Sequence, residues 1–476
     1  MSNIWINKND DDFNQSHSSE KQFLLFNLFD KKNKSNVKTD MEQLWRKFGI
    51  NSLTSINEDF LIIASSIFCV DKRISRRNFS DSWTRTLRLS IPVLEVEKWN
   101  SVKEELEYVI SFLSGDKWIF EFRQTNLRFR TDKINTKNLI DGGKYDSVSL
   151  FSGGLDSFCG ALTLSENKRN TLFLGFREYS LLTNRQKELF DAINDHYTEL
   201  ENELLLFNVN PLAPIQRGEK TERLSVESTS RSRSLLFIAG AISIASIIGK
   251  DTPVYIPENG FIGVNVPLTD SRTGSCSTRT THPIFINSLN LVLDKVGIKN
   301  KVSNFYWNKT KGEILEEHQN NAIFKQYAAR TLSCSHPCLS RYDKKKSDKV
   351  VTPCNCGYCY PCLIRKASFV KIGKDETCYN PLYELSKDFI LNYNNIQGRA
   401  SDLKAVLFSL RRYIDHQKDS EYIRSLLVRQ GPLNSEELDG YEKVYRKSME
   451  ELLEMIKLNG KGLIEYTGIK EVEVHV

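Results

Sequence analysis

The spacing of apolar residues changes character partway along the chain, at about residue 147. From there on, short apolar runs of strand length alternate with longer segments in which apolar residues recur every three or four positions. The expected strands are 147–151, 171–176, 203–209 and 253–257, and the expected helices cover about 156–166, 183–198 and 232–249. This alternation is typical of βαβ units. We therefore predict an α/β fold with a parallel sheet, whose ligands bind at the carboxyl ends of the strands.

A different pattern precedes this core, in the order helix, strand, helix, strand. Helical periodicity at 59–74 and 102–113 alternates with period-two runs at 84–93 and 117–123. These segments predict a small α+β unit without a recognisable catalytic constellation, and the glycine-containing stretch 141–146 ends it as a linker. The polar stretches 8–20 and 31–41 are expected to be mobile.

After the core, residues 383–457 consist almost entirely of amphipathic, helix-forming segments. We therefore expect an N-terminal α+β accessory domain at 1–145, the α/β core at 146–375 and a C-terminal helical region at 376–476. The most apolar stretch, 235–249, has 15 residues and two serines, whereas a membrane-spanning helix needs about 20 apolar residues. It is expected to pack on the sheet. Because the N-terminus also lacks the apolar segment of a signal peptide, the sequence predicts a cytoplasmic protein without a membrane partner.

Composition narrows the class of protein only slightly. The 476 residues are 40% hydrophobic and 11% aromatic, which excludes a disordered chain. Lys and Arg number 66 against 60 Asp and Glu, so the net charge of +6 is a weaker bias than a dedicated nucleic-acid coat carries. Only this charge and the basic run 344–346 favour a nucleic-acid ligand. Nucleic acid is therefore not expected to bind directly. Ten cysteines are too few for a disulfide scaffold, but six of them lie within 334–362, which indicates a metal site.

The first core strand runs directly into a candidate phosphate-binding loop, with a helix behind it. The loop reads Ser152, Gly153, Gly154, Leu155, Asp156, Ser157. Two glycines let backbone N–H groups approach an anion closely, and the N-terminus of a helix adds a positive dipole. The serines can donate hydroxyl hydrogen bonds, and Asp156 can bind Mg²⁺ or position an attacking group. The alternative is a serine N-cap at an ordinary glycine turn. No GxxxxGK[ST] motif stands here, which disfavours a motor that cleaves the γ-phosphate.

The cysteine cluster has the spacing of a metal site. Cys356, Cys359 and Cys362 follow one another at two-residue gaps, and Cys334 lies upstream. Thiolates spaced in this way can converge on one ion, and a fourth from another segment completes a tetrahedral zinc site. An iron–sulfur cluster and a redox disulfide between Cys359 and Cys362 are alternatives. Spacing alone also leaves Cys338 and Cys354 as competing ligands.

The loop and the cysteines together resemble a known family. SGGxDS after a strand is similar to the pyrophosphate-binding loop, or PP-loop, of N-type ATP pyrophosphatases, which cleave ATP between its α- and β-phosphates. With T-x-S-C and then C-G-x-C-x₂-C-x₂-R downstream, residues 146–375 resemble the 7-cyano-7-deazaguanine synthase (QueC) family. The resemblance implies a HUP-type core, similar to the adenine-nucleotide α-hydrolases, with a zinc-binding insertion at 334–362. The matching residues are Cys334, Cys356, Cys359 and Cys362 as zinc ligands, Arg365 behind them, and Arg233, Asn265, Lys311 and Glu313, with Ser234 where the family usually has Asn.

The resemblance also implies roles for individual residues. The six-residue loop would bind pyrophosphate and Mg²⁺, and adenine would lie at the end of the second strand, at Gly175, Phe176 and Arg177. Lys311 would neutralise phosphate charge, and it forms the catalytic set with Asp156, Ser157 and Arg233. The residues expected around the substrate are Glu258, Asn259, Asn265, Arg279 and His282, with Arg231 nearby. His282 precedes a proline and a helix, so helix capping competes with catalysis there.

The sequence departs from the plain synthase in three places. The gap between Cys334 and Cys356 holds 21 residues, residues 258–285 replace the family's substrate-loop pattern, and the segments 1–145 and 376–476 are additions. This arrangement resembles the enlarged relatives found in two bacterial anti-phage systems, Qat and type IV CBASS. The sequence does not separate the two systems, and Qat is the favoured one.

The resemblance therefore implies an ATP-dependent ligase with ATP, Mg²⁺ and Zn²⁺ as cofactors. It would adenylate 7-carboxy-7-deazaguanine and transfer it, as an amide, to a partner protein of the same defence operon. One alternative is the plain synthase, which uses ammonia, and another is tRNA thiolation with cysteine persulfides. A non-catalytic subunit that senses a nucleotide or a deazaguanine is the alternative from another class. The added segments favour a macromolecular partner, although their helices can also serve oligomerisation.

Overall fold

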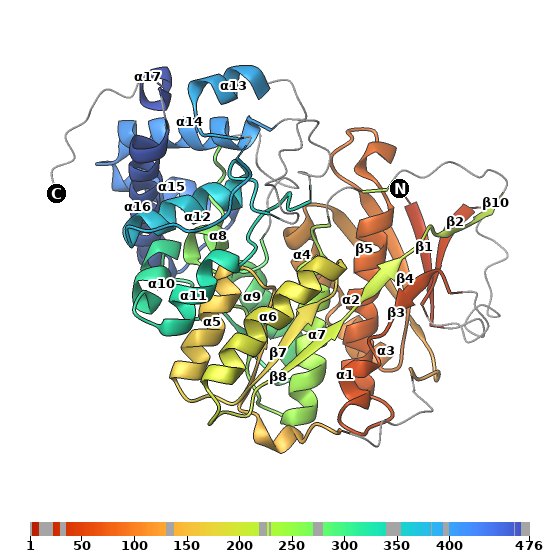
Figure 1. Cartoon of the computed structure of the whole chain (residues 1–476). Coiled ribbons are helices and arrows are strands. Elements are labelled where there is room, and N and C mark those ends of the chain that lie inside the picture. The colour runs from red at the N-terminus through yellow and green to blue at the C-terminus, as the bar shows by residue number, and fades with distance from the viewer. Residues whose placement is uncertain are drawn as a thin grey trace.

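A computed structural model describes residues 2–8, 22–28, 35–129, 138–218, 226–227, 230–269, 279–338, 354–381, 383–393, 399–460 and 462–467. Its central sheet has five strands in the order β12-β11-β6-β7-β8, and all of their pairings are parallel. Strands β7 and β8 of this sheet lie side by side in Figure 1. The strands are β6 (Ser147–Leu150), β7 (Thr171–Phe176), β8 (Glu203–Phe207), β11 (Val254–Tyr255) and β12 (Val302–Ser303). The predicted α/β fold with a parallel sheet is confirmed. The two-residue strand β12 was not predicted, because it is too short to show a period.

Helices cover both faces of this sheet. The helices involved are α5 (Leu155–Glu166), α6 (Ser180–His196), α7 (Arg233–Ile248), α9 (Pro283–Val296), α10 (Lys311–His318) and α11 (Ala322–Tyr327). Successive strand residues point to opposite faces, so Leu172 and Leu174 pack on the side of α7 and α9, while Phe173 packs on the side of α5 and α6. Helix α7 is the apolar stretch that was expected to pack on the sheet. No described helix is both long enough and apolar enough to cross a membrane.

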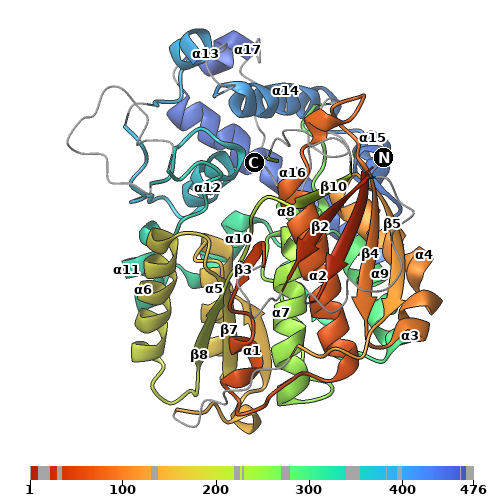
Figure 2. The same ribbon diagram turned by 90° about the vertical axis from the view of Figure 1, so that its right-hand side faces the viewer.

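The N-terminal region forms a second five-stranded sheet, in the order β10-β2-β1-β4-β5. Four of its strands are β1 (Ser2–Asn7), β2 (Gln22–Asn27), β4 (Thr86–Val93) and β5 (Lys117–Gln124), accompanied by α1 (Gln43–Arg46), α2 (Ser55–Arg73), α3 (Val96–Ser101) and α4 (Lys103–Ser114). The fifth, β10 (Ile215–Gly218), follows β8 along the chain and pairs antiparallel with β2. Helix α2 packs against α7 (Figure 2). One hydrophobic cluster therefore extends through the N-terminal region and the central sheet.

One expectation for the N-terminal region was wrong. Of the two polar stretches expected to be mobile, residues 9–20 and 31–34 lie outside the described residues, but Val37–Thr39 forms strand β3. This strand pairs antiparallel with β9 (Val209–Pro211), which follows β8. Its stability comes from a partner about 170 residues away in the sequence, which local polarity does not reveal.

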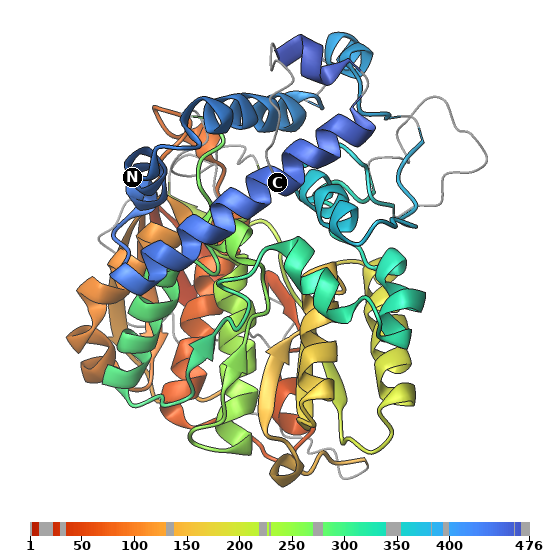
Figure 3. The same cartoon turned by 90° about the vertical axis from the view of Figure 1, so that its left-hand side faces the viewer.

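The C-terminal region is helical, as predicted, and packs around a hydrophobic cluster that it shares with residues 261–268 and 356–367. Its helices are α13 (Lys387–Tyr393), α14 (Ser401–His416), α15 (Ser420–Leu427), α16 (Ser435–Asn459) and α17 (Leu463–Thr467). Helix α12 (Tyr360–Lys371), which precedes this region in the chain, packs with them. The 25-residue helix α16 runs diagonally across the molecule (Figure 3) and packs on α12, α10 and α8 (Gly260–Val264). Helices α8 and α10 leave the carboxyl side of β11 and β12, so α16 lies close to the ligand-binding edge of the sheet.

Candidate functional site

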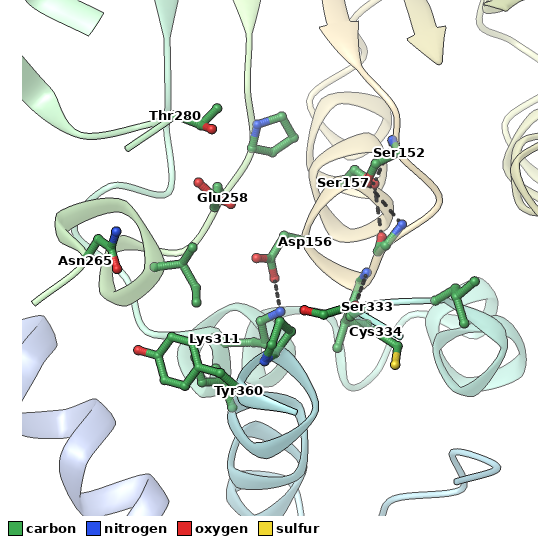
Figure 4. Close-up of a pocket in the computed structure, with 18 of the residues that line it drawn as sticks. Ser152, Asp156, Ser157, Glu258, Asn265, Thr280, Lys311, Ser333, Cys334 and Tyr360 are labelled. Atoms are coloured by element: carbon green, nitrogen blue, oxygen red, sulfur yellow. Dashed lines mark hydrogen bonds and ion pairs between the residues drawn. The ribbon is translucent and has the colours of Figure 1, made fainter. Parts of the chain in front are cut away.

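A cavity of about 530 Å³ opens where the strand order of the central sheet reverses, between β6 and β11. In parallel sheets of this kind, ligands bind in the crevice at such a reversal. Figure 4 shows side chains from the loop after β6, the segment after β11, α10 and the cysteine segment facing one another. The predicted site residues that line it are Ser152, Gly154, Leu155, Asp156, Ser157, Arg233, Glu258, Asn265, Lys311 and Cys334.

The loop after β6 has the backbone of an anion-binding turn. Gly153 has a φ of +79°, a conformation that favours glycine, and a Cβ there would lie 3.1 Å from Cγ of Gln186. The Gln186 amide, from α6, donates to the carbonyl groups of Phe151 (3.2 Å) and Ser152 (3.4 Å). Gln186 therefore holds the loop from behind. Sequence analysis missed it because it lies 29 or more residues beyond the loop, on an ordinary amphipathic helix.

Two serine hydroxyls close the loop around the start of α5. Ser152 Oγ and Ser157 Oγ are 3.0 Å apart, and Ser157 Oγ donates to the Gly154 carbonyl at 3.0 Å. Ser333, beside Cys334, accepts a hydrogen bond from the Leu155 N–H at 3.0 Å, a role that the sequence did not reveal. Among the described residues, the N–H groups of Gly153, Asp156 and Ser157 have no protein acceptor. Such N–H groups at a helix N-terminus are what an anion binds.

Asp156 and Lys311 meet beside this loop. Lys311 Nζ lies 3.0 Å from Asp156 Oδ1 (Figure 4). The Asn259 side-chain amide donates to Asp156 Oδ2 at 2.8 Å. Lys311 is the first residue of α10, and its side chain is 6% exposed. Asn259 does not line the cavity, but it holds the Asp156 carboxylate in place. The arrangement places one ammonium group and one carboxylate, a suitable Mg²⁺ ligand, next to the anion-binding turn.

A second carboxyl group lies on the other side of the cavity. Glu258 follows β11, and its backbone is fixed by Asn304, which accepts from the Glu258 N–H at 3.2 Å and donates to its carbonyl at 2.7 Å. Burial raises the pKa of Glu258 to about 7, and the nearby Asp156 charge adds to this, whereas a hydrogen bond from Thr281 opposes it. Glu258 can therefore hold or accept a proton near neutral pH.

Asn265, another of the residues expected around the substrate, ends α8 in the left-handed conformation, with φ +50°.

The predicted adenine-binding residues do not line this cavity. Gly175 is packed against Leu206 and the Phe151 carbonyl, and the Phe176 ring lies 4.8 Å from that of Phe237. Arg177 forms an ion pair with Asp40, from the N-terminal region. The end of β7 is thus in contact with the N-terminal region, through Asp40, which sequence analysis did not place there.

The other predicted polar residues are distributed between the rim and the packed interior. Arg233 is half-exposed and pairs with Glu178 at 3.3 Å. Arg279 donates to the Phe112 carbonyl (2.7 Å) and to Gln430 (2.6 Å), outside the cavity. His282 is buried and caps α9, where its Nδ1 accepts from the Ile284 N–H at 3.3 Å. Burial, with the Arg279 charge, lowers the pKa of His282 to about 3. The sequence left helix capping and catalysis open as roles for His282, and its contacts show capping.

Two buried residues support the segments that border the cavity. Asp71, on α2, accepts from the backbone N–H groups of Arg231 (2.7 Å) and Ser232 (2.8 Å) at the start of α7. Arg365, fully buried on α12, donates to Thr331 Oγ1 and to the Ala328 carbonyl, both at 2.7 Å. Arg365 therefore fixes the turn that leads to Ser333 and Cys334 rather than lining the cavity.

The four predicted cysteines form a group that can hold a metal ion such as zinc. The Sγ atoms of Cys334, Cys356, Cys359 and Cys362 all lie within 4.8 Å of one another. Two of the Sγ–Sγ distances, Cys334–Cys359 and Cys356–Cys362, are 3.9 Å. Zinc–sulfur bonds of about 2.3 Å in a tetrahedron require about 3.8 Å between sulfurs, so the donor set fits zinc.

The surroundings of the sulfur atoms also suit thiolates. Backbone N–H groups of His336 and Cys356 point at Cys334 Sγ, at 3.2 and 3.3 Å. Donors of this kind stabilise the negative charge on metal-bound sulfur. Cys338 and Cys354, the competing ligands left open by spacing, are not members of the group that the described residues form.

No protein-family model matches the chain, and no curated protein is significantly similar to it. The geometry of the cavity and of the cysteine group, together with the sequence motifs, is what bears on function.

Proposed function

We propose that this chain is an ATP pyrophosphatase with a PP-loop, which activates a carboxylate as an acyl adenylate. The observation that carries the proposal is the meeting of Ser152–Ser157 with Lys311 at the reversal point of a parallel sheet. The turn offers N–H groups to an anion, its two serine hydroxyls hold the loop in shape, and Lys311 supplies a positive charge. These groups suit pyrophosphate, which gains charge as it leaves.

In the proposed reaction, a carboxylate oxygen attacks the α-phosphorus of ATP. The bond between that phosphorus and the bridging oxygen to the β-phosphate breaks, which yields an acyl adenylate and pyrophosphate. Asp156 would hold Mg²⁺, which supplies charge neutralisation when bound. The loop N–H groups and Lys311 stabilise the charge on the leaving pyrophosphate, and because they are already in place this costs little reorganisation.

The acid that we propose as the substrate is 7-carboxy-7-deazaguanine, and the acceptor that we propose is an amine of a partner protein in an anti-phage system. Support for the substrate comes from the resemblance to the 7-cyano-7-deazaguanine synthase family. Support for a protein acceptor comes from the added segments 1–145 and 376–476. The lone pair of the amine attacks the acyl carbon, AMP leaves, and the amine loses a proton. Glu258, whose pKa lies near 7, is the group in the cavity suited to accept that proton.

We propose that zinc is structural in this chain. All four ligands are cysteines, a closed set that leaves no position for a substrate. The segment that carries Cys334 also provides Ser333, which caps the loop through the Leu155 N–H. Zinc would thereby tie the cysteine segment to the phosphate loop.

The test is pyrophosphate release by the full-length chain with ATP, Mg²⁺ and 7-carboxy-7-deazaguanine. Asp156→Ala should abolish release, and Asp191→Ala, on the exposed face of α6, should retain it. Unchanged release in Asp156→Ala would refute the assignment of the loop. Binding of ATP without any release would instead indicate a sensing subunit.

Product analysis separates the acceptors. Intact-mass spectrometry of the partner protein, expressed with and without this chain, should show one added deazaguanine joined as an amide. Formation of the nitrile from ammonia, with no mass shift on the partner, would support the plain synthase.

A further inference from the structure

The start of α10, which carries Lys311, is held by a capping box. Thr310 is the N-cap, and its hydroxyl accepts from the Glu313 N–H at 3.0 Å. The Glu313 carboxylate accepts in return from the Thr310 N–H at 2.9 Å. Because Lys311 is the residue next to this N-cap, the direction in which its side chain leaves α10 depends on the box.

Helix α16 of the C-terminal region engages both halves of that box. Thr310 Oγ1 donates to Glu451 Oε1 at 2.5 Å, and Lys447 forms an ion pair with Glu313. Lys447 and Glu451 are four residues apart on α16, so they share one face of the helix. The Glu451 carboxylate also accepts from the Gly312 N–H, which places a carboxylate at the positive end of α10.

The identity of Gly312 gives independent support for this contact. A Cβ at position 312 would collide with the Glu451 carboxyl group, whose Cδ would lie 2.7 Å away. Glycine is disfavoured inside a helix relative to alanine, and α10 contains it where the carboxylate of α16 takes up the space of a side chain.

We propose that Glu451 is a positioning residue for Lys311, so that the C-terminal helical region completes the phosphate site instead of serving only as a surface for a partner. Glu451 fixes the N-cap and the first turn of α10, and this directs the Lys311 ammonium group at Asp156. The same helix also backs the opposite wall of the cavity, because Val444 of α16 packs beside Gly260 at the start of α8. The role in catalysis rests on the proposed function, whereas the role in placing Lys311 does not.

The contacts of the Glu451 carboxyl group decide what a substitution at this position would remove. Burial raises the pKa of Glu451 to about 7, and the Glu313 charge adds to this, while the Thr310 hydroxyl and the Gly312 N–H oppose it. The cation of Lys447 lies on the Glu313 side of the box. Glu451→Ala removes both hydrogen bonds to α10, whereas Glu451→Gln keeps an acceptor for Thr310. Glu454, exposed on the same helix, is the matched control position.

The experiment is competitive acetylation of lysines in the full-length chain, with Lys311 followed by peptide mass spectrometry. Lys311 is nearly buried and ion-paired, so it should react slowly in the unaltered protein. Glu451→Ala should raise its reactivity about fivefold, the change in population that loss of a typical cap produces. Glu454→Ala should leave it unchanged, and Glu451→Gln should restore most of the protection. Equal Lys311 reactivity in Glu451→Ala and Glu454→Ala would overturn the inference.

A double substitution separates positioning from a general loss of folding. Gly312→Ala alone should raise Lys311 reactivity, because its methyl group displaces the Glu451 carboxylate. In a Glu451→Ala background the same change should add little, because the space is then free. Additive effects of the two substitutions would contradict a direct contact.

Pyrophosphate release is the second readout. If the unaltered chain releases none, the proposed function fails, while the labelling result still decides whether Glu451 positions Lys311. If release occurs, Glu451→Ala should lower kcat more than it raises KM for ATP, since Lys311 acts on charge that develops as pyrophosphate leaves. A kcat equal to that of Glu454→Ala would count against the inference.

Discussion

The partly buried carboxyl group of Glu258 should make the stability of the protein depend on pH. Its pKa in the folded protein is about 7, above its ordinary value of 4.5, so the folded state retains a proton that the unfolded chain releases. Stability from this group is therefore fully present below about pH 4.5 and is lost as the pH rises towards 7. Glu258→Gln stays uncharged at every pH and keeps an oxygen that can accept from Thr281. The substitution should therefore remove this part of the pH dependence.

The size of the effect follows from the shift. Raising the pKa of Glu258 from 4.5 to about 7 means that folding disfavours the charged form, relative to the neutral form, by on the order of 3 kcal/mol. Glu258→Gln should match the unaltered protein near pH 4.5 and exceed it by up to about 3 kcal/mol at pH 8. Urea unfolding of both proteins at half-unit steps from about pH 4.5 to pH 8 measures this difference. Asp156 and Lys311 face Glu258 in both proteins, so their titration contributes to both curves.

The control is Glu454→Gln, an exposed position on α16 that should show no pH-dependent difference. A difference between Glu258→Gln and the unaltered protein that stays constant across this range would refute the reasoning. It would mean that the cavity solvates the Glu258 carboxylate as well as water does.

Two further predictions concern the metal group and the N-terminal region. Cys359→Ser should lower the zinc content of the purified chain and its thermal unfolding midpoint. Cys378→Ser, at an exposed cysteine, should change neither. Full zinc content in Cys359→Ser would contradict the assignment of Cys359 as a ligand. Asp71→Ala should destabilise the protein by about 3–5 kcal/mol, because it leaves the buried Arg85 without one of its carboxylates and the start of α7 without its acceptor. Hydrogen exchange at the first turn of α7 should rise in the same variant, and protection equal to that of the unaltered protein would contradict the prediction.

The sequence by itself determined the features that depend on neighbours along the chain. The alternation of strands and helices predicts the parallel sheet, because side-chain period follows from local backbone geometry. The loop at 152–157 and the three cysteines at two-residue gaps are local motifs, and the structure places both groups beside the same cavity. For the same reason, the proline after His282 was enough to make a helix cap a competing role.

Only the tertiary structure decided which distant groups meet. Gln186 and Glu451 contact the loop and α10 from helices that carry no motif. Ser333 stands inside the T-x-S-C motif, but its contact with the Leu155 N–H became apparent only in the fold. The end of β7 was expected to be open to adenine, but Arg177 pairs there with Asp40, from a stretch expected to be mobile. Likewise, the sequence marks residues 376–476 as an addition that favours a partner or oligomerisation, and the structure packs α16 against both α8 and α10. Contacts of this kind depend on how whole elements pack, and the period of a single segment records only that one face is apolar, not which partner covers it.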